Sequence, residues 1–323
     1  MSRVSVGTVA ELWRYPVKSM GGEKVQTSVL DERALHADRM WAVRDLELNA
    51  VTTARRLPVL LGCTARYVDE PRPGIGPGDV ADVVVTFPDG MEIASSEREA
   101  LDARLSDLVG KPVALVPLPP LHDKSAYRGV LTSKKDIRQQ FGVASDEPLP
   151  DFSMFPLRKL AELAIYATPV GIFADAYALH IVTTSSLRTM ALHGGDFDVR
   201  RFRPNIVIDS PLEGLAEQEW IGGTLQAGEV SAHVEIPTIR CTIPLREQAG
   251  VVADADVMRS VSRHGERCLG VYADIAVGGA LSVGDVVQLD PPRAQNAAAA
   301  SLARLAGRVK HNAVKTGNRI LPR

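Results

Sequence analysis

The chain has 323 residues, of which 45% are hydrophobic and 24% are charged, with a formal net charge of −2. This length exceeds the roughly 250–300 residues that one hydrophobic core usually supports, so we expect a globular protein of two domains. The net charge of −2 gives no basic excess, which argues against nucleic acid as the main partner. No apolar run is long enough to span a membrane, and residues 1–5 lack the apolar core of a signal peptide.

The cysteines bear on the cellular compartment. The chain has three cysteines, at positions 63, 241 and 268, an odd number at wide spacing. This spacing argues against a disulfide scaffold and fits a reducing cytoplasm, so we expect a cytoplasmic protein with no membrane partner. Three cysteines are also too few for a four-cysteine iron–sulfur cluster. Cys63 ends an apolar run and is expected to be a small core residue.

The first third of the chain is predicted to be a small β-rich domain. Residues 8–15 have the composition of a strand that Pro16 limits, residues 25–29 alternate as a second strand, and residues 39–45 form a third. Between the first two strands, residues 18–22 place a lysine and a hydroxyl before two glycines. This loop suits either an anion site or a plain surface turn, and it lacks the glycine and lysine spacing of a P-loop.

A hairpin and a helix complete this domain. Residues 83–87 and 91–93 are β-rich runs on the two sides of a Pro-Asp-Gly turn, which predicts the hairpin. Residues 97–109 are amphipathic and end at a glycine, and Ser96 and Glu99 are expected to form a capping box at the start of this helix. The proline-rich residues 117–128 that follow are typical of a linker between two domains.

The second half is predicted to be a β-barrel. Residues 152–166 are apolar and are expected to hold a short helix. Residues 180–182 form a strand that leads into a helix capped by one of the hydroxyls of residues 183–186, a helix start that suits either capping or anion binding. Short strands at close spacing with glycine-rich turns favour a barrel. We expect them at residues 206–209, 220–225, 230–236, 270–277 and 283–289.

Two stretches in this half carry the clearest chemical signal. Residues 199–203 place three arginines before an apolar run, and Pro204 is expected to keep Arg203 extended. Further along, Arg240 directly precedes Cys241. A neighbouring cation favours the thiolate, which binds metals or attacks electrophiles, and arginine suits phosphate. The pattern predicts a site for an anionic cofactor with a thiolate at its reactive end; the alternative is a surface arginine cluster beside a core cysteine.

Four short motifs follow one another in an order known from one family: Tyr15-Pro16-Val17-Lys18-Ser19, Asp38-Arg39-Met40-Trp41, Arg201-Phe202-Arg203-Pro204-Asn205 and Arg240-Cys241. In these motifs the chain resembles MOSC-domain proteins, in the branch that includes the mitochondrial amidoxime-reducing component and related bacterial reductases. The resemblance implies a mainly β (α+β) fold. Its parts would be a MOSC N-terminal β-barrel-like domain over residues 1–118, a MOSC β-barrel over 119–290, and an Ala-rich helix with a basic tail over 291–323.

The resemblance also implies a molybdenum cofactor, in which a pterin dithiolene with a phosphate tail holds the metal. Cys241 matches the cysteine that ligates this metal, and Asp175 lies in a segment that lines it, so both are expected to be catalytic. The other matches are expected cofactor contacts: Lys18, Ser19, Arg39, Ala176, Tyr177, Arg203, Asn205 and Arg240. A soft thiolate suits a metal that already has sulfur ligands.

The implied activity is the reduction of N-hydroxylated small molecules. The sequence shows no ferredoxin module of the kind found in some bacterial relatives, so the electrons are expected from a separate reductase of the flavin, ferredoxin or cytochrome type. The Ala-rich helix and basic tail are expected to be a solvated helix with a frayed end, and the alternative is that they dock an acidic redox partner. Residues 242–250 depart from the run typical of amidoxime reducers, which leaves the substrate open. Two alternatives also stay open: a sulfur carrier with a persulfide on Cys241, and a protein that stores or passes on the cofactor.

Overall fold

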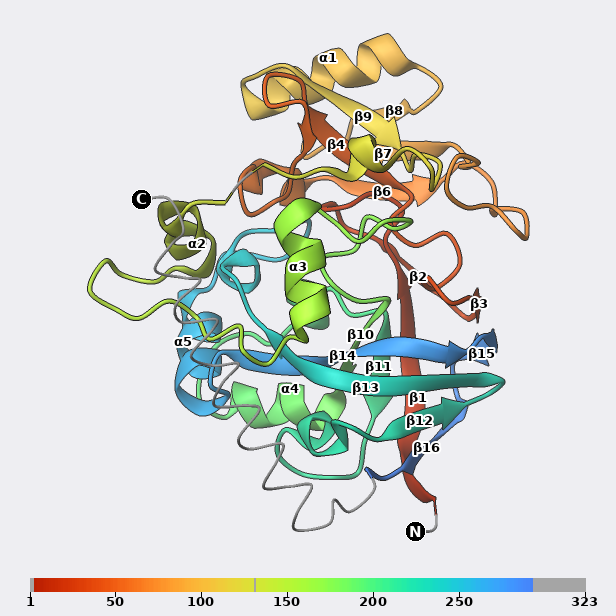
Figure 1. The fold of residues 1–323 in the computed structure, drawn as a ribbon, viewed down its shortest axis with the longest axis vertical. Coiled ribbons are helices and arrows are strands. Elements are labelled where there is room, and N and C mark those ends of the chain that lie inside the picture. The colour runs from red at the N-terminus through yellow and green to blue at the C-terminus, as the bar shows by residue number, and fades with distance from the viewer. Residues whose placement is uncertain (1–2, 131, 293–323) are drawn as a thin grey trace.

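The computed structural model describes residues 3–130 and 132–292, and its larger part is a closed β-barrel of seven strands (Figure 1). The strands run in the order β11, β10, β14, β13, β12, β16 and β1, and pairing of β11 with β1 closes the ring. Their bounds are β1 (Val4–Arg14), β10 (Leu179–Thr183), β11 (Ile206–Asp209), β12 (Thr224–Ala227), β13 (Val230–Ile239), β14 (Cys268–Val277) and β16 (Val286–Asp290). The mainly β fold with a barrel is therefore confirmed.

The first strand of the chain belongs to this barrel. β1 pairs antiparallel with both β11 and β16, and Leu12 lies opposite Ile206. Val6, Val9 and Leu12 are all buried in the barrel core. They lie three residues apart rather than two, because irregularities in the pairing of β1 between residues 5 and 7 and between residues 9 and 11 shift the alternation. The barrel thus takes a strand from the first predicted domain, while the boundary after residue 118 stays a prediction.

The smaller part, in the upper region of Figure 1, has two three-stranded sheets and one helix around a separate core. The predicted hairpin is confirmed as β7 and β8, and the predicted helix as α1 (Arg98–Val109). The predicted capping box of α1 is wrong, because its N-cap is Glu97 and no side chain caps it. The strands are β4 (Trp41–Asp45), β5 (Ala50–Val51), β6 (Thr64–Tyr67), β7 (Val83–Thr86), β8 (Glu92–Ala94) and β9 (Val113–Pro117).

Residues 118–169, which we call the connector, join the smaller part to the barrel. The connector holds η2 (Lys124–Tyr127), α2 (Lys134–Phe141) and α3 (Leu157–Ile165). The short helix expected within residues 152–166 is confirmed as α3, whereas α2 was not predicted. Ser133 and Asp136 form a capping box at the start of α2, so the sequence did contain its signal.

Two helices pack on the outside of the barrel. α4 (Thr184–Ala191) and α5 (Ala255–His264) share a small core that includes Met190 and Val261. The predicted hydroxyl cap of α4 is confirmed, since Thr183 Oγ1 accepts a hydrogen bond of 3.1 Å from the Ser186 amide. The remaining elements are β2 (Glu23–Val25), β3 (Thr27–Leu30), β15 (Gly279–Ser282), η1 (Pro58–Gly62), η3 (Val199–Arg201), η4 (Ala216–Trp220) and η5 (Ile243–Leu245).

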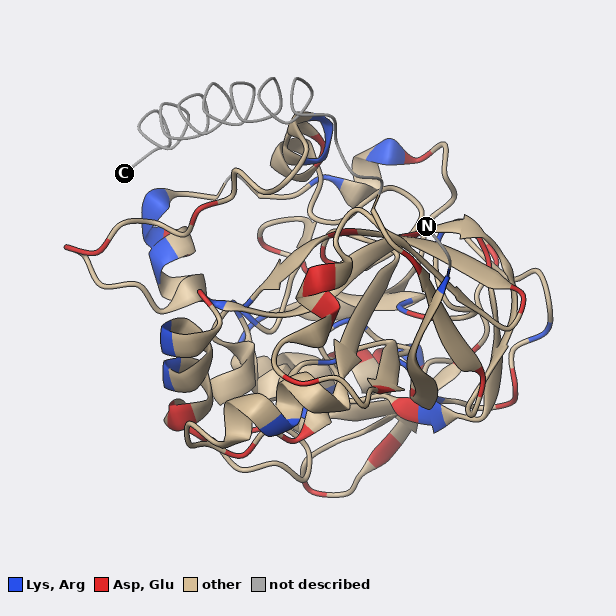
Figure 2. Ribbon diagram, turned by 90° about the horizontal axis from the view of Figure 1, so that it is seen from below, with Lys and Arg blue, Asp and Glu red and all other residues tan. Residues whose placement is uncertain are grey.

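Acidic and basic residues are interspersed along the ribbon (Figure 2), in keeping with the net charge of −2. None of the helices in residues 3–130 and 132–292 combines the length and the apolar character that a bilayer crossing requires. The helix and basic tail expected over 291–323 lie outside the described residues from position 293 onward.

Candidate functional site

A cavity of about 510 Å³ lies where the smaller part, the connector and the barrel meet. This volume is within the roughly 300–1,000 Å³ that small-molecule and cofactor sites occupy. The structure brings all the predicted site residues to its wall: Lys18, Ser19, Arg39, Asp175, Ala176, Tyr177, Arg203, Asn205, Arg240 and Cys241. Residues far apart in the sequence, from both predicted domains, therefore face one common space.

Cys241 lies in the turn between β13 and η5, and its side chain is partly exposed. Backbone hydrogen bonds fix the chain on both sides of it, because the Arg240 amide donates to Arg267 O at 2.8 Å and the Thr242 amide donates to Gln140 O at 2.9 Å. The other two cysteines are buried, and burial raises the pKa of Cys63 to about 12 and that of Cys268 to about 11. Of the three thiols, Cys241 is thus the one placed for chemistry.

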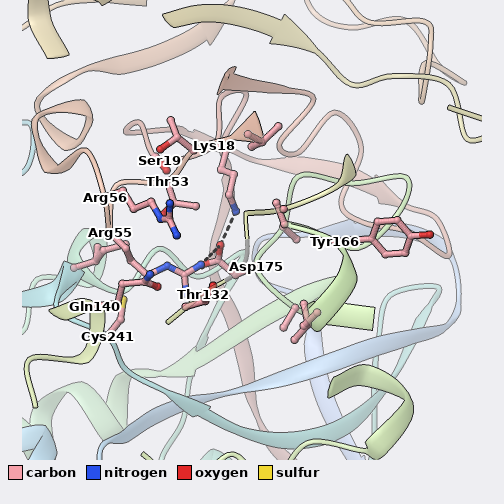
Figure 3. Close-up of a pocket in the computed structure, with 18 of the residues that line it drawn as sticks. Lys18, Ser19, Thr53, Arg55, Arg56, Thr132, Gln140, Tyr166, Asp175 and Cys241 are labelled. Carbon is pink, nitrogen blue, oxygen red and sulfur yellow. Dashed lines mark hydrogen bonds and ion pairs between the residues drawn. The ribbon is translucent and has the colours of Figure 1, made fainter. Parts of the chain in front are cut away.

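Lys18 and Asp175 form an ion pair in the cavity (Figure 3). The Lys18 Nζ atom lies 2.5 Å from Asp175 Oδ1 and donates a second hydrogen bond of 3.0 Å to Phe173 O. Arg55 reaches the same carboxylate oxygen from another loop, at 3.4 Å. Burial would raise the pKa of Asp175, but the cations Lys18 and Arg55 hold it well below its usual range. Asp175 is therefore a fixed negative charge that orients two cations.

Arg39 and Arg203 meet at the boundary between the smaller part and the barrel. Arg39 donates to Asn205 Oδ1 at 3.3 Å and to Arg203 O at 3.4 Å, and it also pairs with Asp38. Three predicted site residues have left-handed backbones, with φ of 74° at Ser19, 51° at Arg39 and 54° at Arg203. This conformation costs an L-residue roughly 1–2 kcal/mol, and such strain clusters at functional sites.

The expectation that Arg203 is extended is therefore wrong. Pro204 disfavours the right-handed helical region for the residue before it, but Arg203 takes the left-handed region instead. In this conformation the Arg203 carbonyl accepts the hydrogen bond from Arg39, and the Arg203 guanidinium donates to Met20 O at 2.5 Å. These contacts between distant segments outweigh the local preference.

Two contacts hold the side chain of Arg240, the residue before Cys241. Its guanidinium donates to Phe202 O at 2.9 Å and to His180 Nε2 at 3.2 Å. Because a guanidinium cannot accept a hydrogen bond, His180 must accept through an unprotonated Nε2. Burial and the neighbouring Arg240 both lower the pKa of His180 well below its usual value, which keeps the ring neutral.

The sequence-based prediction missed the loop that carries Arg55 and Arg56. This loop also brings Thr53 to the cavity wall (Figure 3), and the Ala54 amide donates to Ser19 Oγ at 2.9 Å, which links it to the Lys18 loop. Burial would lower the pKa of Arg55, but Asp175 and Cys241 raise it. Adjacent hydroxyls and arginines in residues 52–56 were the available signal, of the same kind as the lysine and serine at 18–19.

The residues present fit an anionic cofactor that brings its own metal ligands. Within the described part of the chain, neither Arg203 nor Arg240 forms an ion pair, and Arg240 Nε is buried without a hydrogen-bond partner. Burial lowers the pKa of Arg203 to about 10, as expected for a cation that lacks a counter-charge. Across residues 3–130 and 132–292, no group of three or more His, Cys, Asp and Glu side chains is placed to hold a metal ion. A metal beside Cys241 would need ligands from elsewhere, as a dithiolene supplies.

Two family matches cover most of the chain. Residues 6–107 match the family described as MOSC N-terminal beta barrel domain, and residues 170–288 match the MOSC domain. Among solved structures, the YUAD protein from Bacillus subtilis is similar over 89% of this chain and 97% of its own, at 10% identity and a TM-score of 0.39. YiiM from Geobacillus stearothermophilus is similar over 35% of this chain and 54% of its own, at 17% identity and a TM-score of 0.26. No curated protein matches the chain.

The assignment rests on the two family matches rather than on the distant structural similarities. MOSC domains are associated with the molybdenum cofactor, through cofactor binding or sulfur transfer. The order of the matches along the chain agrees with the smaller β-rich part followed by the closed barrel. The chain belongs to the MOSC-domain proteins that carry a MOSC N-terminal β-barrel domain.

Proposed function

We propose that the chain is a molybdenum-cofactor-binding oxidoreductase that reduces N-hydroxylated small molecules with electrons from a separate reductase. The observation that carries this proposal is the convergence in one cavity of a partly exposed thiol and two cations that form no ion pair within the described residues: Cys241, the partly buried Arg203 and the buried Arg240. The bound group would supply the two-electron redox chemistry at the substrate. The protein's own side chains would hold and orient this group and shield it from water.

Each side chain has a role that its contacts suggest. Cys241 would hold the metal through its thiolate, in a turn that backbone hydrogen bonds keep rigid. Arg203, Arg240 and Lys18 would hold the phosphate and the pterin, because buried cations gain most from an anion that replaces lost water. Asp175 would keep Lys18 and Arg55 aligned, since both donate to the same carboxylate oxygen.

The reaction also sets requirements on access. Reduction of an N-hydroxyl group to the amine consumes two electrons and two protons and releases one water. The substrate must therefore reach the metal from an open side of the cavity, and the partial exposure of Cys241 is consistent with such an opening. We expect the electrons from a separate donor, since three cysteines are too few for a four-cysteine iron–sulfur cluster.

The test is metal analysis of the full chain purified from a host that makes the cofactor. We expect about one molybdenum per chain, and reduction of hydroxylamine and of an amidoxime when a chemical reductant supplies electrons. Cys241→Ala should lose both the metal and the activity, whereas Cys268→Ala, which removes a buried thiol elsewhere, should keep them. Full activity in Cys241→Ala would contradict the proposal. A persulfide on Cys241 without bound molybdenum would favour sulfur transfer instead.

A further inference from the structure

The cavity has two walls of different chemistry. The smaller part and the barrel supply its cations, whereas the lining residues from the connector's described part carry no charge. The cations are Lys18, Arg39, Arg55, Arg56, Arg203 and Arg240. The larger apolar side chains that the connector contributes are Ile137, Phe141, Phe152, Phe155, Leu160 and Leu163. The connector lies between the two family matches, so this apolar wall comes from a segment that neither match covers.

Helix α3 shows that the apolar wall faces the cavity. Leu160 and Leu163 lie three residues apart and so share one helix face, and both line the cavity. Leu160 and Leu163 pack in part against Phe155, Tyr177 and the barrel residue Ile236, but neither is fully buried, so part of this face remains open to the cavity. An apolar face beside a hollow is the usual sign of an apolar ligand.

Aromatic rings continue this wall from the connector into the barrel. Phe141 and Phe152 meet edge to face with centroids 5.4 Å apart, and Phe155 follows at 6.4 Å from Phe152. Tyr177 lies 6.2 Å from Phe155 and stacks on Tyr272 at 5.3 Å. Because Tyr177 is two residues from Asp175, the rings reach from the connector to the charged wall.

The connector is also attached directly to the chain next to Cys241. The Thr242 amide donates to Gln140 O, and Arg267 donates to Phe141 O at 2.9 Å. The end of α2 is thereby tied to the residue that follows the thiol. The apolar wall is thus placed beside the reacting position.

A cationic ligand would find no free carboxylate in this cavity. Its lining carboxylates are Asp45 and Asp175. Asp45 pairs with Lys111, and Asp175 pairs with Lys18 and Arg55. A buried positive charge without a counter-charge is strongly disfavoured.

We infer that the connector selects the substrate, and that it selects neutral N-oxygenated compounds with an aromatic group over small polar or cationic ones. This inference rests on the proposed function and names the substrate class of the same site. The aromatic group packs against Phe152, Leu160 and Leu163, while the N-oxygenated end points to Cys241.

Binding of two non-reducible probes tests the inference independently of turnover. Naphthalene-2-carboxamide and naphthalene-2-carboxamidine have nearly the same shape, but the first is neutral and the second is cationic at pH 7. With the purified full chain from the cofactor-producing host, calorimetry should give at least tenfold tighter binding of the amide. Equal affinities, or tighter binding of the amidine, would overturn the inference.

Variants of α3 test whether its cavity-facing side chains cause the preference for the neutral probe. Leu163→Ala should weaken amide binding about tenfold through lost apolar contact. Leu163→Glu should weaken amide binding further and strengthen amidine binding about tenfold, by supplying the missing carboxylate. The matched control is Leu157→Glu on the same helix, whose side chain is 59% exposed and does not line the cavity. It should leave both affinities unchanged, and equal effects at 157 and 163 would overturn the inference.

Kinetics separate this inference from the proposed function. Benzamidoxime should have a higher kcat/KM than acetamidoxime, and Leu163→Ala should reduce that ratio. If neither amidoxime is reduced while the amide is still preferred in binding, the proposed function fails and the apolar selection stands. If both are reduced equally well by the wild type and by Leu163→Ala, the proposed function stands and this inference fails.

Discussion

Arg39 and Arg203 place their guanidinium groups on the same aromatic ring, with Cζ atoms 5.0 and 4.4 Å from the centroid of Tyr15. Arg39 precedes β4 of the smaller part, and Arg203 precedes β11 of the barrel. Each contact is worth about 0.5–2 kcal/mol, more where water is excluded. The ring therefore offsets part of the repulsion between two cations and holds them in position before any anion binds.

This arrangement predicts different effects for two substitutions of Tyr15. Its hydroxyl is buried without a hydrogen-bond partner, so Tyr15→Phe removes an unsatisfied group and should leave stability unchanged or slightly raised. Tyr15→Leu removes both ring contacts and should cost about 1–3 kcal/mol of unfolding free energy. Urea denaturation of the two variants measures this, and metal content should fall only in Tyr15→Leu. Equal losses in both variants would show that the ring does not position the arginines.

A second prediction concerns the space beside His180. Gly270 has φ of 81°, and a Cβ there would meet His180 Nε2 and lie 2.8 Å from Ile181 O. Gly270→Ala should therefore displace His180 from Arg240, in addition to the roughly 1–2 kcal/mol cost of a left-handed alanine. Gly284 has φ of 93° with nothing within 4 Å of its Cβ position, so Gly284→Ala carries only the conformational cost.

The unfolding free energies of the two alanine variants separate the cost of the contact with His180 from the cost of a left-handed alanine. We expect Gly270→Ala to be the less stable by about 1–3 kcal/mol, the usual cost of overpacking. Metal content should fall in Gly270→Ala and stay at the wild-type level in Gly284→Ala. If both variants lose the same free energy and keep the metal, the contact between Gly270 and His180 has no role in the site.

Sequence reasoning succeeded where a local pattern determines the structure. The hairpin at residues 83–93 follows from β-rich runs on both sides of a turn, the apolar run at 39–45 becomes β4, and Thr183 caps α4 as a hydroxyl before a helix should. The arginine cluster and the pair of Arg240 and Cys241 were recognised from the residues themselves, whereas the resemblance to MOSC proteins supplied most of the other candidate site residues. All of them line one cavity. Whether they hold a cofactor stays a prediction.

Where long-range contacts decide the conformation, sequence reasoning failed. Arg203 is left-handed because two distant segments hold it there: Arg39 donates a hydrogen bond to the Arg203 carbonyl, and Met20 O accepts one from the Arg203 guanidinium. Ser96 does not cap α1, whose first turn has no side-chain cap at all. Residues 52–56 did carry a local signal, but the pairing of Arg55 with Asp175, 120 residues away in the chain, could not be read from it. The pattern of residues within a short stretch of sequence does not show which distant residues will come into contact.

A third prediction is selective reactivity of one thiol. In the folded chain purified from a host that does not make the cofactor, only Cys241 should react with a disulfide reagent, because Cys63 and Cys268 are buried and burial raises the pKa of both. We expect one thiol per chain to react quickly under native conditions and three after denaturation. Cys241→Ala should abolish the fast phase, and Cys268→Ala should retain it. A fast phase that persists in Cys241→Ala would contradict the assigned exposure.

The last prediction concerns Glu217, a buried carboxyl in η4 that contacts Thr183 at the end of β10, the strand that contains His180. It accepts hydrogen bonds from Thr183 Oγ1 at 2.6 Å, from Ser186 Oγ, and from the Gly270 amide at 3.1 Å. No cation pairs with it within residues 3–130 and 132–292. Burial raises the pKa of Glu217 despite these hydrogen bonds.

The sign of the resulting pH dependence follows from proton binding. With a raised native pKa, the folded chain keeps a proton that the unfolded chain loses above pH of about 4.3, the ordinary pKa of glutamate. Stability should therefore fall as the pH rises from about 4.3 through the native pKa, at up to about 1.4 kcal/mol per pH unit. Glu217→Gln has no such proton, so its stability relative to the wild type should increase over this range. Urea denaturation at several pH values measures the difference, with Glu219→Gln, an exposed change on the same turn, as the matched control. A constant difference between Glu217→Gln and the wild type across this range would mean that Glu217 titrates alike in the folded and unfolded chain.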